Sequence, residues 1–526
     1  MKKIIYLVAN GDSNQTINQQ AETHQVAIEK QLTSIIEKNH LKPKRAHAFD
    51  RTKQHGFIDS QHHGLEVFRT IPKDASVILV CTIWQCPQNI IAGLYGRKGR
   101  LLIFSVWDEK SQGIASMLEI NGALTRSQIK FNSLWTDDLN NPIFKSRLNN
   151  WLRNGKIKYD SNHTCSFRSK SIPSHFKKIG KSLAKKQREQ KAIMGMLNEG
   201  WKGSCHTIIP DHVLNHFGIF KERICLSKFS REVELVSDAE AKRTFQWLKK
   251  KGVAATHNTK VSTQNDKLSE HLLNQIRRYI GVVRLAHQFG CSIIGIQRRP
   301  EKLIPKSKNE IYEPLLNNVD RPPVYARGTR KEIFSGRAIP FFPDVNEFSA
   351  IDALITNNVW NELGFAPETW AYQLYWGLHI DTEENMVFVW TLITPETPPP
   401  VHLEDHFNSI HRTTKNADKI ICKPGWAVWS SIYMLENKLR ADIGITKILP
   451  LTKEQKQIIL PLIPEGHALM PAVFPGITRD QMLAHHKSHR LQIGYAPSCE
   501  EATRALRVKG ALLSELNIKT TICGRF

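Results

Sequence analysis

Apolar, strand-like runs alternate with helix-like runs near the start of the chain, and this alternation constrains the fold more than any other feature. Residues 4–9 have the composition of a buried strand, and residues 19–38 have the periodicity of a helix. The later segments are strand-like runs at 76–84, 100–107 and 129–135 and a helix-like run at 113–122. Strands separated by helices favour a parallel, doubly wound sheet. No GxGxxG motif follows the first strand, so a dinucleotide site is not supported.

The pattern predicts three domains. Residues 154–174 are polar and basic and are interpreted as a linker after the first domain. A second α/β unit follows, with predicted strands at 192–197, 292–297 and 338–342 and long helices at 238–251 and 268–289. Beyond residue 365 the pattern changes to short strands at 386–394, 427–435 and 439–443 and a helix at 500–516. The predicted fold class is α/β, with parallel-sheet domains at 1–160 and 165–360 and a β-rich barrel or sandwich at 361–526.

Length and composition agree with a multidomain protein of the cytoplasm. The 526 residues are too many for one core. No apolar run approaches the roughly 20 residues of a membrane span, and the N-terminal run ends in a turn at Asn10-Gly11-Asp12, unlike a signal peptide. The nine cysteines are scattered and form no CxxC pair, so neither a disulfide framework nor a zinc site is indicated.

The net charge of +24 raises the question of a polyanionic partner. Basic residues crowd the stretch 168–191, where Ile179 and Leu183 have helical spacing, so we expect a helix with one solvated basic face. Nucleic-acid binding normally interleaves aromatic residues for base stacking, and only Phe167 and Phe176 are available here. The stretch does not favour a nucleic-acid partner.

A series of short blocks resembles the L-fucose/L-arabinose isomerase family. The first block is the glycine-punctuated loop 195–203, which follows a predicted strand at a sheet edge where α/β proteins place ligands. The others, in order, are 208–223, 236–241, 295–297, 315–324, 474–481 and 492–497. The resemblance covers roughly residues 190–525 and is fainter over 75–150.

The resemblance implies two Rossmann-like domains, a barrel-like C-terminal domain, and trimers or hexamers. The large apolar residues Trp84, Trp107 and Trp135 lie in the N-terminal domain that the family uses for subunit contacts. The resemblance also implies aldose–ketose isomerisation of a small sugar through a metal-bound ene-diol, with Mn²⁺ or another divalent cation. The implied sugar-binding positions are Trp201, Lys202 and Gln297. Gln297 equally fits a buried amide at a strand end.

The family holds its metal with Glu, Asp and His, and the corresponding positions here are altered. They are Asp344, Gln373, and either His489 or Arg490, depending on one gap. Asp344 is one methylene shorter than Glu and also fits a helix cap. Glu347 is a possible substitute as ligand and base, whereas the Gln373 amide cannot act as a base at neutral pH.

Two main functional hypotheses follow, beside the weaker alternative that the chain binds polyanions through the basic stretch 168–191. Arg490 about 4 Å from a divalent ion would cost several kcal/mol even at an effective dielectric of about 20. Arg490 and Gln373 therefore favour a metal-free sugar-binding or scaffold relative, whereas Asp344, Glu347 and His489 favour an active isomerase. Further imidazoles cluster at 402–411 and at 485–489, where His485 and His489 have i, i+4 spacing on a predicted helix. We interpret both clusters as chance groupings on polar surfaces.

Overall fold

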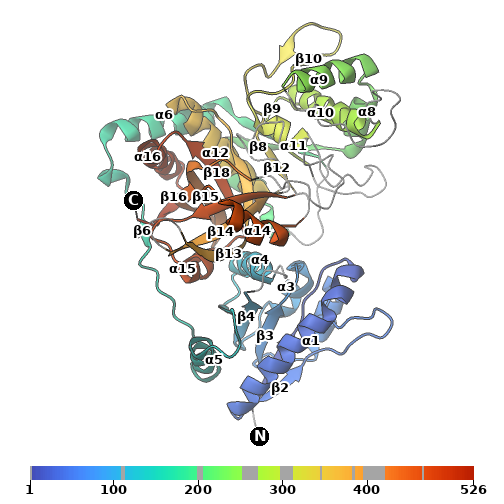
Figure 1. Cartoon of the computed structure of the whole chain (residues 1–526), viewed down its shortest axis with the longest axis vertical. Helices are drawn as coiled ribbons and strands as arrows, with labels where there is room; N and C mark the ends of the chain where they lie inside the picture. Colours follow the sequence, from blue (N-terminus) through green and yellow to red (C-terminus); the bar gives the residue numbers. More distant parts are fainter. Residues whose placement is uncertain are drawn as a thin grey trace.

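The computed structural model describes residues 3–107, 113–197, 205–251, 270–296, 312–343, 346–381, 386–394, 421–464 and 467–525. It is a mixed α/β structure with two parallel sheets and a larger mixed sheet that contains most strands of the C-terminal region. Figure 1 shows the N-terminal elements at one end of the molecule and the sheet with α8–α11 at the other, with the mixed sheet beside both. None of the described helices combines the length and the apolarity needed to span a bilayer.

The first sheet is parallel, with strand order β2-β1-β3-β4-β5. Its strands are β1 (Ile4–Val8), β2 (Lys42–Arg45), β3 (Ser76–Cys81), β4 (Leu101–Val106) and β5 (Asn132–Thr136). Its helices are α1 (Gln15–Lys38), α2 (Gln61–Arg69), α3 (Gln88–Leu94), α4 (Gly113–Arg126) and α5 (Pro142–Asn154). The predicted alternation and the parallel sheet are confirmed. The sequence did not predict β2, because this edge strand reads Lys-Pro-Lys-Arg and has no apolar face.

The second sheet is also parallel, with order β12-β9-β7-β8. Its strands are β7 (Ala192–Leu197), β8 (Ile219–Ile224), β9 (Cys291–Ile296) and β12 (Phe341–Pro343). The helices of this region are α6 (Ser174–Gln190), α7 (Asp211–Asn215), α8 (Leu226–Glu234), α9 (Asp238–Lys250), α10 (Glu270–Gln288), α11 (Tyr312–Asn317) and α12 (Glu347–Leu363). A two-stranded ribbon of β10 (Val324–Tyr325) and β11 (Glu332–Ile333) accompanies them. The predicted helices at α9 and α10 are confirmed.

The third sheet has eight strands in the order β15-β18-β13-β14-β17-β16-β19-β6, and β15 also pairs with β16. The pairings therefore run through six strands and return to β15. Its strands are β6 (Thr164–Ser166), β13 (Trp370–Asp381), β14 (Met386–Thr394), β15 (Gly425–Leu435), β16 (Lys438–Ile448), β17 (Ala468–Val473), β18 (Arg490–Ala496) and β19 (Lys519–Cys523). The helices here are α14 (Lys453–Ile459), α15 (Arg479–His485) and α16 (Cys499–Glu515).

The predicted linker at 154–174 is partly wrong, because it contains a strand of the third sheet. Strand β6 pairs with β19, and the following helix α6 packs on α16, so Figure 1 shows both beside the C-terminal elements. The helices approach so closely that a Cβ on Gly180 would lie 2.6 Å from the Ala511 Cβ. The predicted basic helix is confirmed: α6 buries Phe176 and Leu183, and its lysines face solvent.

Two of the three N-terminal tryptophans, Trp107 and Trp135, are buried inside the chain, and Trp84 is half-buried with its ring 5.0 Å from that of His489. Trp107 is buried with its ring 5.5 Å from that of Trp390 on β14. Trp135 is also buried and donates a hydrogen bond from Nε1 to Asp480 Oδ1 at 3.0 Å. These contacts join the first sheet to the third, so the two side chains give no support to the predicted trimer or hexamer.

Candidate functional site

Four of the predicted site residues, Glu347, Gln373, His489 and Arg490, belong to the described part of the chain. The others, Asp344, Gln297, Trp201 and Lys202, lie outside the described residues, as do the histidines at 402–411.

Gln373 and Arg490 are direct neighbours across two antiparallel strands. β13 pairs with β18 in a register that sets Gln373 opposite Arg490. Opposed residues of an antiparallel pair project from the same face of the sheet. The structure therefore brings together two positions that are far apart in sequence, and it places a guanidinium beside an amide there.

His489 lies just before β18 and not on a helix, so the predicted helical spacing with His485 is wrong: α15 ends at His485. The His489 side chain is only 2% exposed. Its Nδ1 lies 2.5 Å from Glu119 Oε2, and its Nε2 accepts a hydrogen bond of 3.3 Å from Arg490 Nε. Both ring nitrogens therefore already have protein partners.

Glu119 is the charged centre of this cluster, and the sequence analysis did not identify it. It lies on α4 and is buried, and its Oε1 is 3.0 Å from His206 Nε2. Burial opposes ionisation of Glu119, but the His206 and His489 imidazoles outweigh it and hold its pKa well below its usual range. Burial lowers the pKa of His489 despite the neighbouring carboxylate. The cluster is therefore a buried carboxylate held between two imidazoles.

Glu347 begins α12 and is fully buried. Its Oε1 lies 2.9 Å from Lys221 Nζ, and its Oε2 accepts a hydrogen bond of 2.5 Å from the Ile209 amide. The helix is capped by Asn346, whose side chain accepts from the Ser349 amide, so the alternative of Asp344 as the cap is wrong. Both carboxylate oxygens of Glu347 therefore have partners within the protein.

A small polar cavity lies where α4, α12, β15 and β18 meet. Its lining includes Glu119, Arg126, Asp352, Lys487 and Arg490. The space open to water-sized molecules measures about 30 Å³, far below the roughly 300 Å³ at which ligand pockets begin. The described residues around it thus enclose room for about one water molecule.

The buried cation Lys509 supports one wall of this cavity, and the sequence analysis did not identify it either. Lys509 Nζ lies 2.6 Å from Asp352 Oδ1 and donates hydrogen bonds to Thr356 Oγ1 at 2.7 Å and Ser430 Oγ at 2.5 Å. Burial lowers the Lys509 pKa, although Asp352 opposes this. Three oxygen partners hold the ammonium group, and Asp352 is thereby fixed in the cavity wall.

No protein-family model and no curated protein matches the chain.

Proposed function

We propose that this chain is a metal-independent binding protein for a small sugar or sugar acid, derived from the ketol isomerase lineage. The main observation behind this proposal is the direct pairing of Arg490 with Gln373 across two strands. The neighbouring His489 already contacts Glu119 and Arg490. The parallel strand orders and the ring of six paired strands support the Rossmann-like and barrel-like parts of this assignment.

Electrostatics supports the loss of the metal. A divalent ion about 4 Å from the Arg490 guanidinium would be repelled by roughly 8 kcal/mol at an effective dielectric of about 20. A metal bound to His489 Nε2 would also have to displace Arg490, and Glu347 is neutralised by Lys221. The site residues within the described part of the chain therefore do not fit the implied Mn²⁺ site.

The same charges favour an acidic ligand. Arg126, Lys487 and Arg490 line the cavity together with hydroxyl and amide groups, and the two carboxylates of the lining, Glu119 and Asp352, are paired with His206 and Lys509. A guanidinium binds a carboxylate through two parallel hydrogen bonds, and hydroxyl and amide groups suit sugar hydroxyls. We therefore infer that an aldonic acid binds more tightly than the corresponding neutral aldose, after an opening of the cavity.

The metal test compares the unmodified protein with Asp344→Glu/Gln373→Asp/Arg490→His. We expect no Mn²⁺-dependent rise in melting temperature and no isomerisation of L-fucose or L-arabinose by the unmodified protein. The triple variant should gain Mn²⁺ binding, because it restores two negative charges and an imidazole; Arg440→His, elsewhere in the same sheet, is the matched control. A Mn²⁺ stabilisation of the unmodified protein that His489→Ala abolishes would identify an active isomerase instead.

The ligand test measures melting temperature with L-fucose, L-arabinose and their aldonic acids. The acids should stabilise the protein more than the sugars, and Arg490→Gln should remove most of that difference while Arg440→Gln keeps it. Equal or absent shifts for all four compounds would reject the proposal.

A further inference from the structure

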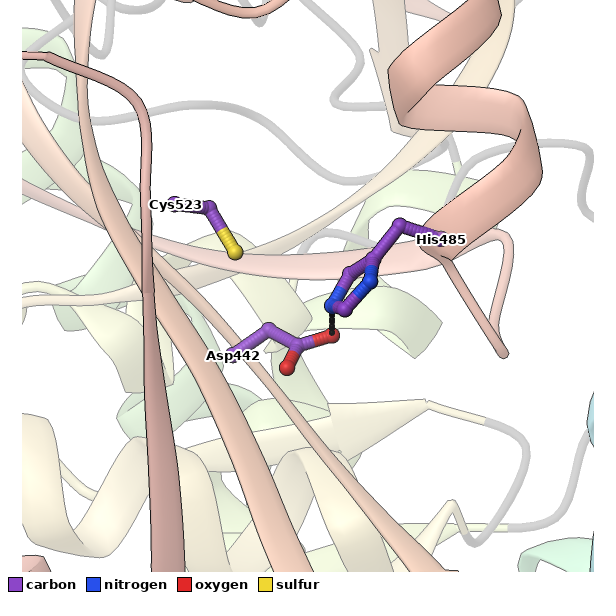
Figure 2. Close-up of side chains that lie close together, drawn as sticks. All are labelled: Asp442, His485 and Cys523. Carbon is purple, nitrogen blue, oxygen red and sulfur yellow. Dashed lines mark ion pairs between the residues drawn. The ribbon is translucent and has the colours of Figure 1, made fainter. Parts of the chain in front are cut away.

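Three side chains of metal-ligand types converge within the third sheet, and one of them, His485, belongs to the cluster at 485–489 that the sequence analysis interpreted as a chance grouping. They are Asp442 on β16, His485 at the end of α15 and Cys523 at the end of β19. One ligand atom from each lies within 4.8 Å of the others. Figure 2 shows the three side chains pointing toward a common point between the strands and the helix.

The sheet register explains this convergence. β16 and β19 are parallel neighbours in which Asp442 is opposite Thr521. Cys523 is two residues beyond Thr521, and side chains two apart project from the same face of a strand. Asp442 and Cys523 therefore share one face, and α15 brings His485 onto it.

Polar atoms in this cluster lack the partners that buried groups normally have. Asp442 is fully buried, and its Oδ2 forms an ion pair with His485 Nε2 at 3.1 Å. The adjacent His486 is also buried, with both ring nitrogens unpartnered and Nδ1 3.9 Å from the same Oδ2. The nearby His163 Nδ1 is unpartnered as well. Buried polar atoms without partners are rare and costly, and a bound ion is one explanation for them.

The arrangement differs from that of a cysteine nucleophile. In such a triad one imidazole nitrogen faces the carboxylate and the other faces the thiol. Here the His485 nitrogen that contacts Asp442 is also the one on the side of Cys523 (Figure 2). One point shared by sulfur, nitrogen and oxygen is the geometry of a metal centre.

We propose that Asp442, His485 and Cys523 bind one Zn²⁺ ion. Mixed thiolate, imidazole and carboxylate ligands suit Zn²⁺, whereas Mg²⁺, Ca²⁺ and Mn²⁺ prefer oxygen. Bonds of about 2.0–2.3 Å require the ligand atoms to close by roughly 1 Å, within the reach of side-chain rotation. Binding deprotonates the thiol, so each Zn²⁺ displaces the Cys523 proton into solvent.

The site has an entry path and a source for a fourth ligand. His485 is 25% exposed, and it lines a cleft of about 670 Å³ together with Tyr433, Phe131 and Tyr159. Water from this cleft, or the imidazole of His486, completes the tetrahedron. The ion would tie β16, β19 and α15 together, so we expect Zn²⁺ to raise the melting temperature.

The test is Zn²⁺ titration of the chelator-treated full chain, with metal content measured by mass spectrometry after gel filtration. We expect one Zn²⁺ per chain, and affinity more than about 100-fold weaker in Cys523→Ser and His485→Ala, since loss of a ligand exceeds the 10–100-fold effect of an outer partner. Cys225→Ser and His212→Ala change an exposed cysteine and histidine elsewhere and should bind as the unmodified protein does.

Co²⁺ provides a second readout that does not depend on the folding of a variant. In the unmodified protein, saturating Co²⁺ should produce a thiolate-to-cobalt absorption band. Absence of that band, or Zn²⁺ binding that is equal in Cys523→Ser and Cys225→Ser, would overturn the proposal. The result is independent of the Mn²⁺ and sugar tests, which concern Gln373 and Arg490.

Discussion

Two buried clusters in this molecule combine one carboxylate with two imidazoles, and they differ in how the carboxylate oxygens are used. Glu119 presents one oxygen to His206 and the other to His489, at 3.0 and 2.5 Å. Asp442 turns a single oxygen, Oδ2, toward both His485 and His486, at 3.1 and 3.9 Å. The first cluster distributes its partners, and the second crowds them around one point.

The difference shows that residue type alone does not determine whether a site takes a metal. Around His489, the nitrogen that a metal would need accepts a hydrogen bond from Arg490 Nε, so the protein itself supplies the positive charge. Around His485, a single Asp442 oxygen faces two imidazoles, both ring nitrogens of His486 lack hydrogen bonds, and a thiol lies beside them. A cation from solution is therefore not required in the first cluster, whereas in the second it would provide a partner for buried polar atoms.

The largest effect is expected for His489→Leu. This change leaves the buried Glu119 carboxylate with one imidazole fewer, and breaking a buried polar pair in this way costs about 3 kcal/mol. Urea unfolding at neutral pH, with chelator present, measures the loss. A loss of unfolding free energy below about 1 kcal/mol would mean that His489 does little to stabilise the buried Glu119 carboxylate. The proposed difference between the two clusters would then be wrong.

His47 separates the effect of burial from that of a charged partner. It is buried, and its Nε2 accepts a hydrogen bond from the Ala9 amide. Burial, with help from Arg45, lowers the His47 pKa to about 3. The unfolded chain, with a histidine pKa near 6.5, binds more protons than the folded chain between these values, so stability falls as pH falls through this range.

The expected loss from His47 is about 2 kcal/mol between pH 8 and pH 5, from roughly 1.4 kcal/mol per pH unit. Urea unfolding at both pH values gives the change in unfolding free energy for the unmodified protein and for His47→Gln. The difference between these two changes is the contribution of His47. If the two proteins lose stability in parallel, His47 is not held neutral in the fold.

The smallest effect is expected for His486→Leu in the absence of metal. Both nitrogens of this buried ring lack hydrogen bonds, so an apolar side chain of similar size removes a desolvation cost, and the change should lie within about 1 kcal/mol or stabilise the protein. Urea unfolding beside His489→Leu gives the matched comparison. A loss as large as that of His489→Leu would show that the two clusters are equivalent in stability.

The parts of the fold that follow from local pattern were predictable from sequence. The apolar runs of β1 and β3 indicate strands that are buried on both faces. The periodicity of α10 indicates a helix that is buried along one stripe. Some of the strands that were not predicted carry no such signature, whereas β13, β17 and β18 have largely buried apolar runs that the sequence analysis did not identify. β8 reads Ile-Phe-Lys-Glu-Arg-Ile at the edge of its sheet, and β6 lies within a polar segment.

The candidate sites depended on long-range register, which a single sequence does not display. The resemblance singled out Gln373 and Arg490, and the strands do set them opposite each other. Nothing local marks Glu119, whose partners come from elsewhere in the chain. Cysteine spacing gave no zinc signal because Cys523 meets Asp442 and His485 only through the pairing of β19 with β16.

The attachment of β6 and α6 to the C-terminal elements has a consequence for folding kinetics. Arg188 on α6 donates a hydrogen bond to the Glu515 carbonyl across 327 positions of sequence, and β6 pairs with β19 over a similar separation. Contacts of such long range form slowly, because the entropy of closing the loop is lost before the contact is made. We therefore expect refolding through intermediates in which the two parallel sheets are ordered while the mixed sheet still lacks an edge. Such an open edge invites pairing with another chain, so aggregation during refolding should increase with protein concentration.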